Sequence, residues 1–233
     1  MLYIMNKKIL LLFVLVAAFL QGCKLDPPVY GPPPKEDWSA SFQPLGVGSY
    51  WKYLKTTAEQ DPDTAESRVT GDQPVINGRT YHTVYTQLTK FGGESYFYTA
   101  DSAVTVRDYS SIAGGYIQIK YVIDSIGTVG QTWTEKITDD GMLNGYPARV
   151  VGTVIENNIT KVLNGITYPR VRHTRMQLQQ DKGSGFETLA TYDYYIAMGV
   201  GVIENIGVAA DGTDLGHSTL LSFVIKNNDI IIN

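Results

Sequence analysis

Few side chains in this 233-residue chain have the types and the spacing that catalytic or metal chemistry requires. The three histidines, His82, His173 and His217, are far apart in the sequence, and no HExxH or Cys-x-x-Cys pattern accompanies them. We therefore expect histidines at the surface or at strand edges. The segment Gly183-Ser184-Gly185 lacks the glycine spacing of a hydrolase elbow, G-x-S-x-G, and predicts a turn. The sequence favours a protein that is not an enzyme and carries no cofactor.

Acidic side chains gather in the short segments 61–66, 139–141 and 211–214. Oxygen-rich loops can bind calcium, but none of these has the spacing of an EF-hand loop. Aspartate and glycine also form ordinary turns, because the aspartate side chain accepts hydrogen bonds from nearby backbone amides. We expect turns here and no metal. A hydrolase would need two carboxylates at a fixed separation, which the sequence does not determine, so a hydrolase with an unrecognised site stays open as an alternative.

Tyrosine is abundant, with 16 residues, and its rings could stack on a sugar or line a lipid cleft. Tyrosine is also a favoured strand residue. Because Tyr194 and Tyr195 are adjacent, they must face opposite sides of a strand, and at most one can join a given binding face. Trp51 and Trp133 are expected in the core.

Cys23 is the only cysteine, so no intrachain disulfide is possible. The apolar run from Ile9 to Leu20 follows Lys7 and Lys8 and ends just before Gln21-Gly22-Cys23. These are the positive, apolar and small-residue parts of a secretory signal. About a dozen apolar residues are too few for the roughly 20 that a membrane-spanning helix needs.

Leu20-Gln21-Gly22-Cys23 resembles the lipobox of bacterial lipoproteins. The resemblance implies that residues 1–22 are a signal peptide and that Cys23 carries the lipid that holds the protein to a membrane. Lys24, where inner-membrane lipoproteins commonly have aspartate, favours the outer membrane and leaves its periplasmic and outer sides both open. Met5 is an alternative start. An ordinary secreted protein with a single thiol is the alternative to a lipoprotein.

Residues 23–40 are rich in proline and predict an extended tether between the lipid and the folded part. The chain has 19 basic and 23 acidic residues, and the signal peptide removes two of the basic ones. This acidic balance argues against a nucleic acid partner.

The folded part has period-two patterns rather than helical ones. Ile117, Ile119, Tyr121 and Ile123 alternate with more polar residues, which predicts a strand with one wet face. Asn-Gly pairs at 77–78 and 164–165 predict type I′ hairpin turns, because both positions of that turn need a left-handed backbone. The fold class is therefore all-β, with antiparallel sheets.

An internal repeat organises these strands. Val47-Gly48-Ser49-Tyr50-Trp51 is echoed by Val129-Gly130-Gln131-Thr132-Trp133, and the segment 75–81 is echoed by 162–168. We predict two tandem, pseudo-symmetric β repeats, 41–115 and 127–226, the second including a C-terminal strand. Each repeat alone buries little apolar area, so we expect the two to form one sandwich or half-barrel-like domain.

The segments 44–53 and 194–203 resemble stretches of uncharacterised Bacteroidota-type outer-membrane lipoproteins, which implies no known chemistry. The sequence thus favours a non-enzymatic envelope module that binds another envelope protein or a glycan. A carrier that shelters a lipid or another hydrophobic ligand in a β cleft is the alternative. A carrier needs a large apolar cavity, whereas an assembly module needs a filled core and an exposed patch.

Overall fold

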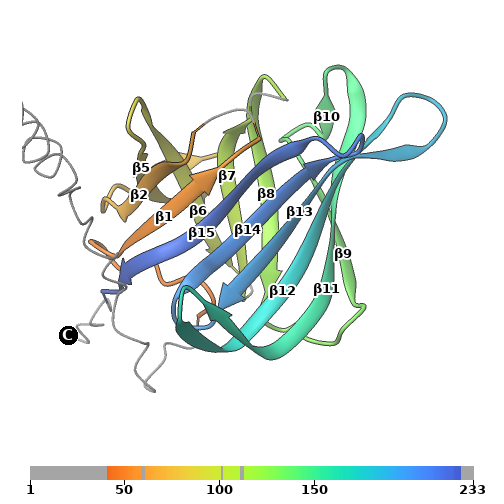
Figure 1. Cartoon of the computed structure of the whole chain (residues 1–233). Coiled ribbons are helices and arrows are strands. Elements are labelled where there is room, and N and C mark those ends of the chain that lie inside the picture. Colours follow the sequence, from red (N-terminus) through yellow and green to blue (C-terminus); the bar gives the residue numbers. More distant parts are fainter. Residues whose placement is uncertain (1–40, 59–60, 101, 111–112, 227–233) are drawn as a thin grey trace, which may run out of the picture.

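The computed structural model describes residues 41–58, 61–100, 102–110 and 113–226. Figure 1 shows that most of the strands belong to one strongly curved sheet whose two ends approach each other. All strand pairs are antiparallel, so the predicted all-β antiparallel class is confirmed, and the sheet is nearly closed and barrel-like. Within the described ranges, no helix is long and apolar enough to cross a membrane.

The strands are short at the start of the chain and long in its second half. In chain order they are β1 (Tyr50–Thr56), β2 (Asp63–Val69), β3 (Val75–Ile76), β4 (Arg79–Thr80), β5 (His82–Gln87), β6 (Gly92–Ala100), β7 (Ala103–Ser110), β8 (Gly115–Ile123), β9 (Thr132–Lys136), β10 (Met142–Leu143), β11 (Tyr146–Leu163), β12 (Ile166–Asp181), β13 (Phe186–Ala197), β14 (Gly201–Ala209) and β15 (Asp214–Val224).

The sheet consists of two meanders, in which strands close in sequence lie side by side. One is β1-β2-β5-β6-β7-β8, and the other is β9-β11-β12-β13-β14-β15, with β10 also on β11. β15 pairs with β1 and joins the meanders into one 13-stranded sheet. β3 and β4 form a separate two-stranded hairpin.

Asparagine-glycine pairs form the tight hairpin turns. The φ angles of Asn77 and Gly78 are 51° and 75°, and those of Asn164 and Gly165 are 51° and 78°. These left-handed values and the flanking strand pairs confirm the two predicted turns. A third turn, at Asn144-Gly145, has the same geometry but was missed, although the same dipeptide marks it.

The open ends of the sheet meet along a line that we call the seam, where β8 packs against β9, β11 and β12. Among the described residues, one backbone hydrogen bond crosses it, from Gln118 N to Ile137 O at 2.6 Å. Side chains supply the others: Trp133 Nε1 donates to Lys120 O at 2.9 Å, and Thr174 Oγ1 donates to Tyr121 O at 2.8 Å. The backbone groups on this edge of β8 therefore form hydrogen bonds mainly with side chains.

Apolar side chains fill the space behind the seam. Ile117, Ile119 and Tyr121 of β8 are buried there, which confirms the predicted alternation as far as Tyr121. Beyond it the alternation fails, because Val122 is buried and Ile123 is half-buried. Trp133 is 9% exposed in this cluster, and Trp51 is 2% exposed in a second cluster, so both tryptophans are core residues as expected. The segment before β1 also packs inward, since Phe42 is buried in the first cluster.

The shared end of β11 and β12 bends back over the sheet as a folded hairpin, residues 157–170 (Figure 1). Asn158 and Arg170 have φ angles of 56° and 53°, and the β11–β12 ladder shifts register three times nearby. Asn164 Nδ2 donates to Leu220 O at 3.0 Å. Because β12 and β15 are not neighbours in the sheet, the folded hairpin must cross β13 and β14 to reach Leu220.

The seam tolerates no side chain at Gly152. A Cβ built there would lie 2.1 Å from Cε2 of Trp133, which stands opposite Gly152 in the ladder. Gly152→Ala is therefore expected to displace the indole, break its bond to Lys120 and lower the free energy of unfolding by about 1–3 kcal/mol. Urea denaturation of the purified domain measures this change.

The matched control is Gly93→Ala in β6, where an added Cβ meets no atom within 4 Å. Its unfolding free energy is expected to stay within about 0.5 kcal/mol of the wild type. Equal effects of the two substitutions would contradict the proposed role of the Trp133 contact.

Candidate functional site

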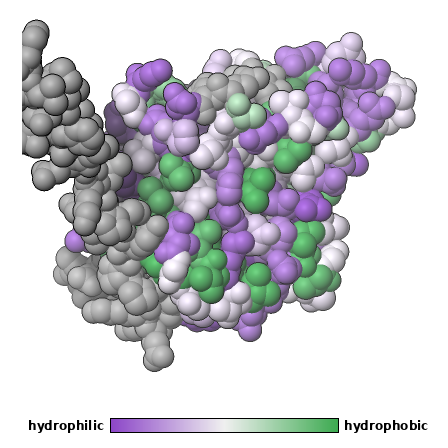
Figure 2. Space-filling view, in the orientation of Figure 1, coloured by the Kyte–Doolittle hydropathy of each residue, from purple (hydrophilic) through white to green (hydrophobic). Residues whose placement is uncertain are grey.

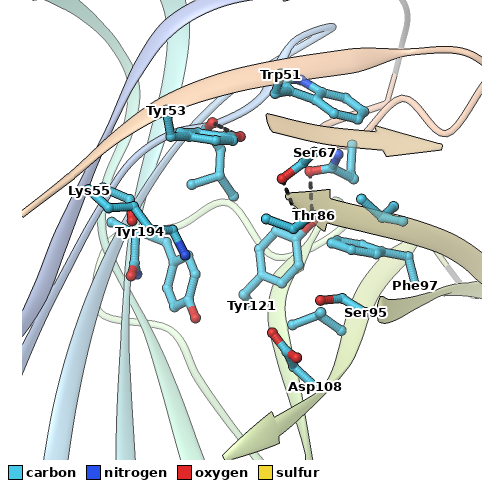
Figure 3. A pocket seen from close by; sticks show the side chains of 16 residues that line it. Trp51, Tyr53, Lys55, Ser67, Thr86, Ser95, Phe97, Asp108, Tyr121 and Tyr194 are labelled. Atoms are coloured by element: carbon cyan, nitrogen blue, oxygen red, sulfur yellow. Dashed lines mark hydrogen bonds between the residues drawn. The ribbon is translucent and has the colours of Figure 1, made fainter. Parts of the chain in front are cut away.

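The concave side of the curved sheet lines a partly open cavity of about 200 Å³, which we call the inner cavity (Figure 3). Strands of both meanders contribute to it. Its lining consists of Gln43, Trp51, Tyr53, Lys55, Ser67, Val84, Thr86, Ser95, Phe97, Val106, Asp108, Tyr121, Tyr194, Val202, Asn205 and Ser218.

The period of two along each strand explains this lining. Trp51, Tyr53 and Lys55 alternate along β1, so all three side chains face the same side of the sheet. Lys52 lies between them and faces outward, where its Nζ is 3.0 Å from Oε1 of Glu66. Tyr194 lines the cavity and its neighbour Tyr195 does not, as their adjacency predicted.

Aromatic rings form much of the cavity wall. The rings of Tyr121 and Tyr194 are stacked, with centroids 5.5 Å apart and an interplanar angle of 22°. The Tyr53 hydroxyl donates to Val202 O at 2.9 Å, and the Tyr121 hydroxyl donates to Oε1 of Gln43 at 2.9 Å. Burial raises the pKa of Tyr53, Tyr121 and Tyr194, so these hydroxyls stay neutral at ordinary pH and serve as hydrogen-bonding groups.

Two charged side chains face the inner cavity, Lys55 from β1 and Asp108 from β7. Neither forms an ion pair with a residue that the structure describes. Solvent reaches Asp108, but the protein around its carboxylate still raises its pKa, an effect that Ser95 and Lys55 only partly offset. The cavity thus combines apolar rings with an ammonium and a carboxylate group.

A second space of about 330 Å³, the outer hollow, adjoins the inner cavity. The two share Val106, Asp108 and Tyr194. The outer hollow extends to Ser110, the last residue of β7, and to Leu215, near the start of β15. It therefore leads from the inner cavity toward one end of the barrel-like sheet.

His173 is buried, so the prediction of a surface or strand-edge histidine is wrong for this residue. Its Nε2 lies 2.8 Å from Oδ1 of Asp193, and its Nδ1 lies 3.1 Å from Oε2 of Glu156. Its ring stacks on Tyr195 with centroids 4.2 Å apart. These partners lie on neighbouring strands, which the sequence spacing does not reveal. His82 and His217 are half-buried, in β5 and β15.

This cluster continues to the folded hairpin. Lys161 Nζ lies 2.8 Å from Oε2 of Glu204 and 3.6 Å from the centroid of Tyr195. His217 Nε2 lies 2.9 Å from Oε1 of the same glutamate. Every charge has a partner at short distance, which is the arrangement of a structural network rather than of an open site.

Two of the three acidic segments form turns, whereas residues 63–66 of the segment 61–66 belong to strand β2, so the turn prediction is wrong there. Asp140 accepts from the Met142 amide at 2.9 Å, and Asp211 accepts from the Thr213 amide at 2.9 Å. Asp181 accepts from the amides of Gly183 and Gly185, which confirms the turn around Ser184. Among the described residues, no group of three His, Cys, Asp or Glu side chains could hold a metal ion.

Cys23, the one site residue that the sequence identifies, lies outside the described residues. Lys55 and Asp108 were missed, because they belong to no motif and meet only when the sheet curves. The alternation of Trp51, Tyr53 and Lys55 along one strand was the available signal for an inward-facing charge.

No protein-family model matches the sequence, and no curated protein matches it. One similar structure is that of a Bacteroides fragilis protein, proposed to be exported, with a YmcC-like fold. It has a TM-score of 0.47 and 10% identity, and the match covers 80% of this chain and 100% of that one. Another is a proposed lipoprotein of Parabacteroides distasonis, with a TM-score of 0.47, 11% identity and coverages of 79% and 99%.

The raised pKa of Asp108 has a consequence for stability. The ionised carboxylate is disfavoured in the folded state, so its destabilising effect is absent below the ordinary aspartate value of 3.8 and complete above the raised value. Asp108→Asn is therefore expected to raise the urea midpoint at about pH 7. The gain is expected to vanish at about pH 3.

Glu187→Gln, which removes a carboxylate from an exposed position of β13, is the control and is expected to leave the midpoint unchanged at both pH values. A lower midpoint of Asp108→Asn at about pH 7 would contradict the prediction, because it would mean that the Asp108 carboxylate makes a net stabilising contact.

Proposed function

We propose that this chain is a non-enzymatic binding protein of the cell envelope, and that its inner cavity holds a small ligand. The observation that carries the proposal is the inner cavity itself, where aromatic rings and two charged side chains line one partly open space. Ligand sites combine these features, since apolar walls supply affinity and a few polar groups fix orientation.

The size and the polarity of the inner cavity favour a small molecule over a long acyl chain. Its volume of about 200 Å³ is below the roughly 300–1,000 Å³ of pockets that hold drug-sized ligands. Lys55 and Asp108 face it, and a hydrocarbon chain would leave both charges without a partner. A carrier of lipid is therefore the weaker alternative. The outer hollow supplies a route for entry.

An assembly role has one specific observation in its favour, an aromatic cluster on the outer face of β7 and β8. Tyr109 and Tyr116 are 61% and 42% exposed, with ring centroids 6.0 Å apart, and Arg107 lies over the Tyr116 ring. Such a surface suits a protein or glycan partner. On the face shown in Figure 2, by contrast, hydrophobic side chains are scattered among hydrophilic ones.

The membrane attachment is proposed from the sequence. The lipobox-like segment supports cleavage before Cys23 and a lipid on its thiol, and Lys24 supports the outer membrane. The proline-rich residues 23–40 would hold the barrel-like sheet away from the lipid surface.

We also propose that the two meanders derive from one duplicated unit. Trp51 lies in the first strand of one meander and Trp133 in the first strand of the other. Each indole donates to a backbone carbonyl, that of Val200 for Trp51 and that of Lys120 for Trp133. The residues opposite the two tryptophans on the neighbouring strand differ, because Trp51 pairs with Ser67 and Trp133 pairs with Gly152. The two units have therefore diverged in sequence at this position.

Filling the inner cavity tests the binding function. Native mass spectrometry of the Cys23→Ser protein, purified gently from its own envelope, is expected to show a co-purifying small molecule. Ser218→Phe, which adds a ring to the cavity lining, is expected to remove that mass, because ligand and ring would occupy the same space.

Ser222→Phe is the matched control, because Ser222 lies opposite the outward-facing Lys52 on the same strand pair. It is expected to keep the bound mass. A wild-type protein that carries no small molecule, or a mass that survives Ser218→Phe, would contradict binding in the inner cavity.

The anchor is tested separately. Wild-type protein is expected in the membrane fraction and to incorporate labelled fatty acid, whereas Cys23→Ser is expected in the soluble fraction without label. Ser41→Ala provides a control for the substitution itself. Fatty-acid labelling that persists in Cys23→Ser would show that another residue is modified.

A further inference from the structure

The two charges of the inner cavity lie on different walls. Lys55 belongs to β1 and Asp108 to β7, and three strands separate these two in the sheet order. Figure 3 shows Lys55, Asp108 and the rings of Tyr121 and Tyr194 around the same space. The cavity therefore combines a positive group, aromatic surface and a negative group.

Neither charge has an ion-pair partner among the described residues, although the positive charge of Lys55 partly offsets the rise that desolvation causes in the pKa of Asp108. Lys55 forms no ion pair with the described part of the chain, and Asp108 accepts only hydrogen bonds, among them one from the Tyr109 amide at 2.8 Å. The cluster around His173 and Glu204 differs, because each charged group there lies within 3.1 Å of an oppositely charged or hydrogen-bonding partner. Lys55 is half-buried and Asp108 is exposed to solvent, so both charges are accessible to a ligand with complementary charges.

We propose that the ligand of the inner cavity is a small zwitterion with an apolar or aromatic body, the charge pattern of a free amino acid. This inference rests on the proposed binding function. The ligand's anionic group pairs with Lys55, its cationic group pairs with Asp108, and its body packs on Tyr121 and Tyr194. Charge-assisted hydrogen bonds at both ends fix its orientation.

Four compounds of similar size separate the contributions of the two charges. L-Phenylalanine carries both, 2-phenylethylamine only the cation, 3-phenylpropanoate only the anion, and 2-phenylethanol neither. Isothermal titration calorimetry of the Cys23→Ser protein at fixed salt, after unfolding and refolding to remove bound molecules, is expected to rank phenylalanine first. Its affinity is expected to exceed that of each singly charged compound by about tenfold.

Two cavity variants assign each charge to its wall. Asp108→Asn is expected to lower the affinity for phenylalanine to that for 3-phenylpropanoate. The affinity for 3-phenylpropanoate itself is expected to stay unchanged. Lys55→Met is expected to lower the affinity for phenylalanine to that for 2-phenylethylamine. The outward-facing pair gives matched controls, and Lys52→Met and Glu66→Gln are expected to leave all four affinities unchanged.

The outcomes distinguish this inference from the binding function beneath it. Two results would show that the cavity binds a ligand but that the ligand is not a zwitterion. One is that 2-phenylethanol binds as tightly as phenylalanine, and the other is that Asp108→Asn weakens the binding of phenylalanine and of 3-phenylpropanoate equally. If none of the four binds while native mass spectrometry finds another molecule, only the inference fails. If neither experiment finds a ligand, the binding function fails with it.

Discussion

The curvature of one antiparallel sheet, closed at the seam, is the constraint on which the rest of the molecule depends. A free strand edge must satisfy its backbone groups, and β8 does so with the side chains of β9 and β12 instead of a full ladder. Arg172 is the clearest case: it is 5% exposed and donates to Ile123 O at 2.7 Å. Because the sheet curves this far, the strands that carry Lys55 and Asp108 come to face one shared space.

Arg172 also ties the seam to the segment that precedes β1. Its guanidinium lies 4.5 Å from the Phe42 ring centroid, and its Nε donates to Asn157 at 3.0 Å. Asp124, whose pKa burial raises, is the nearby carboxylate that partly compensates the charge. An arginine suits this position, since its planar group can donate in several directions and also lie over a ring. One buried cation therefore joins the seam, the start of the folded hairpin and the N-terminal segment.

Local patterns made part of this structure predictable. The alternation in β8 and the Asn-Gly turns follow from the geometry of strands and type I′ turns, which act over a few residues. The burial of His173 was not predictable, because Glu156 and Asp193 reach it from different strands. The same holds for Lys55 and Asp108, whose meeting depends on the curvature of the whole sheet. The sequence thus identifies strands and turns but not the cavity.

The pairing of β1 with β15 has a consequence for how the chain reaches its fold. These strands come from opposite ends of the folded part, Tyr50 lying opposite Val224 and Thr56 opposite His217. A contact between such distant segments forms slowly, because a very long loop must close first. Until β15 is complete, one edge of β1 stays open and able to pair with another chain. Folding must therefore finish after the whole chain has been delivered, and aggregation competes with it during that interval.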